Sequence, residues 1–127
     1  MSQFTDGKRR SFKAGSGLTA AENYVVKQDT DGTVVLAGAN GTGAIGILHN
    51  QPSAGDSASV ILRSGQGTAK IKLGGSVTTY GSAITSQAGG TGIVTTTAGD
   101  QVIGTALGLG VSGDVIEIML TTGKYGA

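Results

Sequence analysis

The stretch GDVIEIML, residues 113–120, places a glycine and an aspartate directly before an alternating run of branched apolar residues. Two related stretches occur earlier, AGDSASVIL at 54–62 and AGDQVIG at 98–104. Glycine readily adopts the backbone conformation of a tight turn, and an aspartate carboxylate can accept hydrogen bonds from the backbone N–H groups that follow it. We therefore interpret these pairs as turns that start strands rather than as catalytic or metal-binding carboxylates: Gly55 with Asp56, Gly99 with Asp100, and Gly113 with Asp114.

The composition of the 127-residue chain favours the same fold class. Glycine accounts for 24 residues, well above an average usage of about 7 %. β-Branched residues, which favour pleated strands, are abundant, and no amphipathic helix of useful length is visible. The length suits one domain with a core and is too short for two ordinary ones. We predict an all-β protein with a single compact barrel-like or sandwich-like domain of about eight short strands.

The strands are predicted by turn signals from residue 23 onward. NYVVKQ and TVVLAG, joined by DTDG, indicate a β-hairpin, because Asp-Gly supplies the positive φ values of a tight loop. TALGLG could form one short helical turn. Further strands are expected in AIGILH, ASVILR, TAKIKL, IVTTT, QVIGTAL and VIEIML, with two possible short strands in SVTTYGSAITSQ.

The first 22 residues differ from the rest of the chain. Four basic residues and Asp6 give residues 1–13 a net charge of +3, and no periodicity is visible that would bury one face. We predict an extended basic arm over residues 1–22 and a β domain over residues 23–127. A disordered terminus without a role is the alternative.

The sequence supports neither of two common cofactor-binding motifs. GTGAIG, residues 41–46, matches the G-x-G-x-x-G fingerprint of dinucleotide-binding folds. That fingerprint opens a helix, and Pro52 lies too close to permit one. The chain contains no G-x-x-x-x-G-K-[ST] motif, which excludes a P-loop ATPase. We expect no cofactor.

Candidate catalytic and metal-binding groups are equally sparse. There is no cysteine, and His49 is the only histidine. Asp29, Asp31 and Gly32 resemble the start of a calcium loop, but the glutamate that closes such a loop is missing, so a hairpin turn is the better interpretation. We therefore expect no metal site and no enzymatic activity.

The composition also limits the binding partners and the cellular locations that we expect for this protein. No apolar stretch approaches the roughly 20 residues that cross a bilayer, and the N-terminal segment lacks the apolar stretch of a signal peptide. A surface of Thr, Ser, Gln and Gly with 13 % charged residues suits contact with another protein better than contact with nucleic acid. We expect no membrane and no nucleic-acid partner.

Taken in order, several stretches resemble the small capsid decoration, or cement, proteins of tailed bacteriophages. AIGILHNQPSAGDSASVIL resembles an earlier strand pair of that family, and TAKIKLGGSVTTYGSAITSQAGGTG resembles its central section, except that Ser82 follows Gly81 where an aspartate is more usual. VIGTALGLGVSGDVIEIML resembles the C-terminal segment, where V-x-G-x-A-L-x-x-G-x-x-G-D-x-I-x-V-x-L is usual. The residues that match this pattern are Val102, Gly104, Ala106, Leu107, Gly110, Gly113, Asp114, Ile116, Ile118 and Leu120.

The resemblance implies a structural virion protein that binds the outer surface of an expanded phage head and stabilises contacts between major capsid subunits, as a homotrimer. It would be made in the bacterial host cytoplasm and located on the capsid exterior. Its arm would lie on the capsid, where cationic and apolar side chains would contact the major capsid protein. The candidates for these contacts are Phe4, Lys8, Arg9, Arg10, Phe12, Lys13 and Leu18.

Two other protein classes share the composition. A phage tail-tube or other β-rich virion assembly protein is the main alternative, and it would differ by forming rings or tubes on its own. A carbohydrate-binding module needs exposed aromatic rings for stacking on sugars, and only Tyr24, Tyr80 and Tyr125 are available besides the two phenylalanines.

Overall fold

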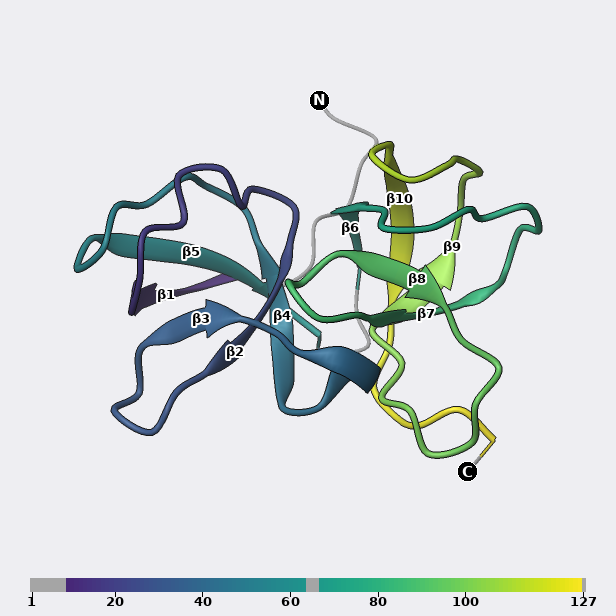
Figure 1. Cartoon of the computed structure of the whole chain (residues 1–127), viewed down its shortest axis with the longest axis horizontal. Helices are drawn as coiled ribbons and strands as arrows, with labels where there is room; N and C mark the ends of the chain where they lie inside the picture. Colours follow the sequence, from purple (N-terminus) through teal and green to yellow (C-terminus); the bar gives the residue numbers. More distant parts are fainter. Residues whose placement is uncertain (1–8, 64–66, 127) are drawn as a thin grey trace.

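The computed structural model describes residues 9–63 and 67–126, and within these ranges it contains ten strands in two antiparallel five-stranded sheets (Figure 1). The first sheet has the order β1-β5-β4-β2-β3 and the second has the order β6-β10-β9-β7-β8. The all-β fold class is confirmed. The strands are β1 (Arg9–Lys13), β2 (Val25–Gln28), β3 (Val34–Leu36), β4 (Ala44–Leu48), β5 (Ser57–Leu62), β6 (Thr68–Lys72), β7 (Ala83–Ser86), β8 (Gly92–Val94), β9 (Gly104–Ala106) and β10 (Val115–Leu120), with a 3-10 turn, η1 (Ala39–Gly41), before β4.

The local predictions hold for the hairpin and fail for the helical turn. β2 and β3 pair around DTDG, where the Asp29 N–H donates to the Thr33 carbonyl at 2.7 Å. TALGLG forms no helix, because its first part is in β9 and Gly110 pairs with Val77 in an antiparallel bridge. GTGAIG leads into a strand, β4, so the helix that a dinucleotide site requires is absent there.

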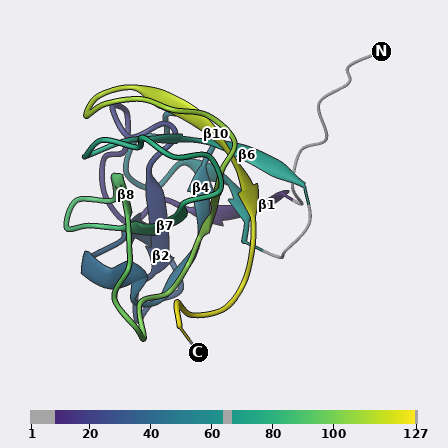
Figure 2. The same cartoon turned by 90° about the vertical axis from the view of Figure 1, so that its right-hand side faces the viewer.

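Each sheet curls until its two edges meet. A parallel bridge joins Ala14, just after β1, to Val34 of β3, and a second joins Leu73, just after β6, to Gly92 of β8. The Gly15 N–H donates to the Val34 carbonyl at 2.8 Å. These bridges make two small barrel-like units, and Figure 2 faces the second of them.

The two units repeat the same strand order and the same register. Val26 is paired with Leu36 and with Gly46 in the first unit, and Ile84 is paired with Val94 and with Gly104 in the second. Each residue of the second set follows its counterpart by 58 positions, as Ile84 follows Val26. The pairing of β1 with β5 recurs between β6 and β10 in the same way, with β6 one position further along. The chain therefore contains an internal structural repeat. Residues 9–62 form the first unit and residues 68–120 form the second.

The central strands of the first sheet, β4 and β2, are buried on both faces. Successive residues of β2, Val25 and Val26, point to opposite sides and belong to different core clusters. One cluster fills the first unit and contains Ala14, Leu18, Ala21, Val26, Val34, Leu48, Ala58 and Val60. The other fills the second unit and extends to Val25, Ala37, Ala44, Ile47 and Ile61 of the first unit. Because this second cluster contains side chains from both units, it holds the two units together.

Residues 9–22 differ from the predicted arm. β1 pairs with β5 along its whole length, and Ala14, Leu18 and Ala21 are buried in the core of the first unit. A strand that ends after five residues and leads into an irregular segment lacks the sustained alternation that predicts a strand, so this part of the chain was assigned to the arm. Residues 1–8, with the predicted contacts Phe4 and Lys8, lie outside the described residues.

Candidate interaction surface

The three Gly-Asp pairs are turns in the structure. Gly55, Gly99 and Gly113 have φ values of 85°, 95° and 93°, in the left-handed region that favours glycine. β5 begins directly after the first pair and β10 directly after the third, whereas the second pair precedes a single bridge between Gln101 and Lys124.

Two of the three aspartate carboxylates, those of Asp100 and Asp114, accept hydrogen bonds from preceding residues and not from following ones as predicted. Asp114 Oδ2 accepts from the Val111 N–H at 3.0 Å. Asp100 Oδ2 accepts from the Thr95 hydroxyl at 2.6 Å, and this pair is buried. Both carboxylates therefore stabilise their turns through hydrogen bonds to residues that come before the turn, which is a structural role.

The predicted capsid-binding residues fall into two groups. Arg9, Arg10 and Lys13 are exposed on β1, and the Arg10 guanidinium lies 4.8 Å from the centre of the half-buried Phe12 ring. Leu18 is only 2 % exposed and belongs to the core, so the structure overturns its assignment as a surface anchor.

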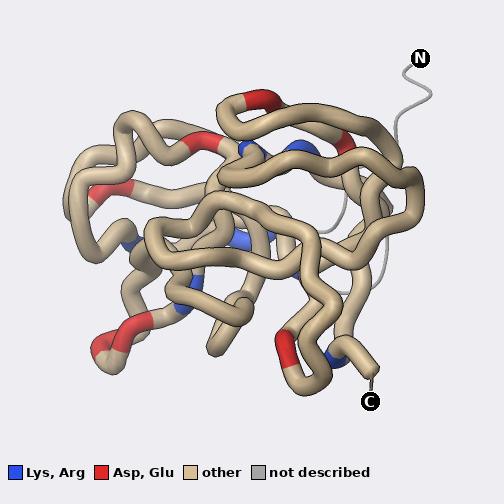
Figure 3. The backbone as a smooth tube through the Cα atoms, turned by 45° about the vertical axis from the view of Figure 1, so that its right-hand side comes forward, with Lys and Arg blue, Asp and Glu red and all other residues tan. Residues whose placement is uncertain are grey.

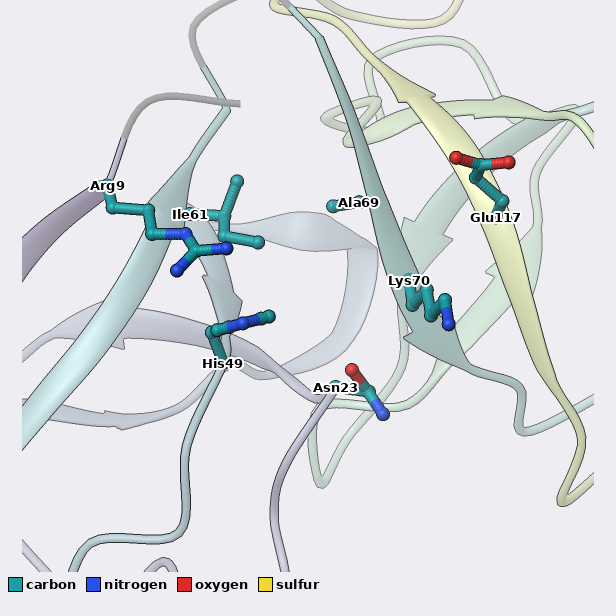
Figure 4. A pocket seen from close by; sticks show the side chains of 7 residues that line it. All are labelled: Arg9, Asn23, His49, Ile61, Ala69, Lys70 and Glu117. Atoms are coloured by element: carbon teal, nitrogen blue, oxygen red, sulfur yellow. The ribbon is translucent and has the colours of Figure 1, made fainter. Parts of the chain in front are cut away.

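A pocket of about 490 Å³ lies between the two units (Figure 4). Two buried apolar residues, Ile61 of β5 and Ala69 of β6, form part of its lining. Figure 4 shows Arg9 and His49 on the side of the first unit and Lys70 and Glu117 on the side of the second. Asn23 completes the lining.

The pocket carries charged groups of both signs as well as apolar residues. It brings two cations, Arg9 and Lys70, together with one carboxylate, Glu117, which faces Lys70 in cross-strand register. Within the described ranges no group of three or more His, Cys, Asp or Glu residues is placed to hold a metal ion, and no helix is long and apolar enough to cross a membrane. Sequence reasoning missed the pocket because its residues come from six separate segments.

A second feature of the surface is an apolar face on the second unit. Its six members are the exposed large hydrophobic residues of the described chain, and we call them the apolar face: Tyr80, Leu107, Leu109, Val111, Val115 and Met119. Val115 and Met119 alternate with Glu117 on one side of β10, and the Leu107 N–H donates to the Glu117 carbonyl at 2.9 Å. Charged residues of both signs are interspersed along the rest of the described backbone (Figure 3).

Two ionisable groups are perturbed for structural reasons. Burial lowers the pKa of the Arg63 guanidinium, which donates to the Val102 carbonyl at 2.9 Å, the Gln101 side chain at 3.2 Å and the Gly123 carbonyl at 3.2 Å. The pKa of Asp31 is lowered mainly by the hydrogen bond from the Thr33 hydroxyl to its carboxylate. Neither group faces the pocket.

Comparison with known proteins identifies the fold. No family model matches the chain, and no curated protein matches it. Three solved chains match, and one of them is the N base of the head fiber gp8.5 of bacteriophage phi29. The two are 17 % identical and superpose with a TM-score of 0.69 over 94 % of this chain and 98 % of that one. The protein therefore shares the fold of a phage head-fiber base over almost its whole length.

Proposed function

We propose that the protein is a non-enzymatic structural component of a tailed-bacteriophage virion that binds the outer surface of the expanded head and stabilises contacts between major capsid subunits. The observation that supports this most strongly is the likeness to the head-fiber N base, which extends over nearly the full length of both chains. The resemblance of residues 102–120 to cement proteins supports the same class of protein from the sequence.

The cationic residues between and beside the units suit a capsid partner that presents acidic groups. Arg10 and Lys13 extend from β1 into solvent, while Arg9 and Lys70 line a pocket with an apolar floor. An acidic side chain that enters the pocket would be attracted by Arg9 and Lys70, of which Lys70 also faces Glu117, and would lie against the apolar Ile61 and Ala69. Many copies on a symmetric head make a modest affinity per site sufficient. We propose a homotrimer as the bound form.

The experiment is co-sedimentation of the purified protein with expanded heads of its parent phage, with unexpanded proheads as the control. We expect saturable binding to expanded heads alone, with a copy number that matches a set of symmetry-related positions. Binding to neither form, together with rings or tubes of the free protein, would contradict head decoration and favour the tail-tube alternative.

Charge-reversal variants test the cationic surface. Arg10→Glu and Lys13→Glu, each measured separately, should weaken binding to heads, and raising the salt concentration should narrow the difference from wild type. Lys124→Glu, an equal charge change at an exposed position near the C-terminal end, is the matched control. Equal losses in all three variants would show that net charge, not this surface, governs binding.

A further inference from the structure

The internal repeat offers a comparison for the apolar face. Residues 107–115 of the second unit, LGLGVSGDV, correspond to residues 49–57 of the first, HNQPSAGDS. The two segments share their Gly-Asp turn and its backbone hydrogen bonds. The Asp114 N–H donates to the Val111 carbonyl at 3.0 Å, and the Asp56 N–H donates to the Ser53 carbonyl at 3.0 Å. The same backbone is therefore built twice, once with apolar and once with polar side chains.

The side chains differ in kind at every position that the apolar face uses in this segment. In the first unit Gln51 Nε2 donates to Glu22 Oε1 at 3.1 Å. The corresponding residues of the second unit are Leu109 and Tyr80, two large hydrophobic residues that are exposed. The other substitutions, first unit to second, are His49 to Leu107, Ser53 to Val111 and Ser57 to Val115. Because the fold forms without apolar residues at these positions, the fold alone does not explain them.

The structure also shows what covers this kind of surface. Ile61, on the outer side of β5, is 3 % exposed because the second unit packs over it. Its counterpart on β10 is Met119, which is 51 % exposed. What covers this position in the first unit is therefore another copy of the same five-stranded unit.

We propose that the apolar face is the contact through which one copy of this chain binds another. None of its six members is charged; the charged residues beside it are Glu117, between Val115 and Met119 on β10, and Lys70 and Lys72 of β6, which pair with Glu117 and Val115. Depletion of charged residues together with large apolar side chains is typical of homo-oligomer interfaces, whereas transient contacts resemble ordinary surface in composition. An apolar surface left uncovered would promote aggregation of the free protein. The proposal does not depend on head binding, and it supplies a subunit contact for the proposed homotrimer.

The test uses the first unit as the template for substitution. In one variant of the full chain, Tyr80→Glu and Leu109→Gln introduce the polar pair of the first unit, and Val111→Ser and Val115→Ser complete the exchange. Sedimentation velocity and light scattering at micromolar to millimolar concentrations should show an oligomer for wild type and a monomer for the variant. Circular dichroism should show the same β content in both. Ser53→Gln with Ser57→Gln, at the corresponding positions of the first unit, is the control and should leave the oligomer intact.

Two results would overturn the proposal: a wild-type protein that is monomeric throughout this range, or a folded variant with unchanged association. If the fourfold variant does not fold, Val111→Ser alone should weaken self-association at least tenfold, and an unchanged association constant would refute the contact. Head binding is measured separately by co-sedimentation. A monomeric variant that still binds heads supports this contact without affecting the proposed function, whereas an intact oligomer that binds no heads contradicts the proposed function alone.

Discussion

Glycine at position 46 allows two strands to approach more closely than any other residue would permit. A Cβ built on Gly46 would overlap the Ile61 carbonyl oxygen of β5. In the second unit a Cβ on Gly104 would lie 2.5 Å from the Met119 carbonyl oxygen of β10. The same residue type at corresponding positions shows that this close approach belongs to the design of the repeated unit.

Gly46→Ala should therefore lower the free energy of unfolding by about 3 kcal/mol, because backbone rather than a flexible side chain must move. Urea unfolding followed by circular dichroism measures the change. Gly17→Ala is the control, since a Cβ there meets nothing within 4 Å. Similar small losses in both variants would contradict the close-approach explanation.

Asp31 stabilises the hairpin turn through its ionised form. Its carboxylate accepts hydrogen bonds from the Thr33 hydroxyl at 2.6 Å and the Thr33 N–H at 3.1 Å, which lower its pKa. Because the folded-state pKa lies below the unfolded value, the stabilisation is present above the unfolded pKa and is lost as the pH falls through the folded pKa.

A carbon-detected NMR titration should place the midpoint of Asp31 below its ordinary value of 3.8. Thr33→Val removes the hydroxyl donor and should move the midpoint upward toward 3.8. A midpoint that does not change in Thr33→Val would assign the shift to another cause.

At the level of elements, β1 is part of the first barrel-like unit rather than an appendage. It pairs with β5 through five residue pairs, and the segment after it contributes Ala14, Leu18 and Ala21 to the core. Sequence reasoning placed most of the other strands well because each follows a turn signal with a short alternating run. β1 lacks the alternating run of apolar residues that marks those strands, and its partner lies more than 40 residues away in the chain.

Deleting residues 1–21 should unfold the first unit, since it removes an edge strand and three buried side chains. Loss of the thermal transition, or a fall in Tm of tens of degrees, is expected by circular dichroism. Deleting residues 1–8 leaves every described contact in place and should change Tm little. A stable, fully folded 22–127 fragment would show that residues 9–21 are part of an arm and not of the core.

Across the whole molecule, Arg63 joins the two units. It follows β5 of the first unit, and its guanidinium donates to backbone and side-chain acceptors on residues 101, 102 and 123 in the C-terminal half. Together with the shared core cluster, this network makes independent unfolding of either unit unfavourable, and we expect one cooperative transition.

Arg63→Ala should lower the free energy of unfolding by about 2 kcal/mol, because the carbonyl oxygen of the buried Val102 loses its charged donor. Arg63→Lys should recover part of this loss, since one ammonium cannot reach all three acceptors. Chemical unfolding monitored by Tyr fluorescence and by circular dichroism measures both. Lys124→Ala, at an exposed position, is the control. Two separated transitions in the wild type would contradict cooperative coupling of the units.

The local features of this protein follow from its sequence. β-Branched runs and Gly-Asp or Asp-Gly turns predict short strands, because backbone sterics and side-chain period act over a few residues. The sequence also argues against a dinucleotide site in GTGAIG, since Pro52 leaves no room for the helix that such a site requires. The tertiary structure alone reveals what depends on distant partners: β1 against β5, the burial of Leu18, the pocket between the units and the repeat. The repeat is not evident from the sequence, because its two halves share strand spacing and register more than residue identity. The apolar face becomes distinctive when the two halves are aligned by strand register, because the first unit has polar residues at most of the same positions.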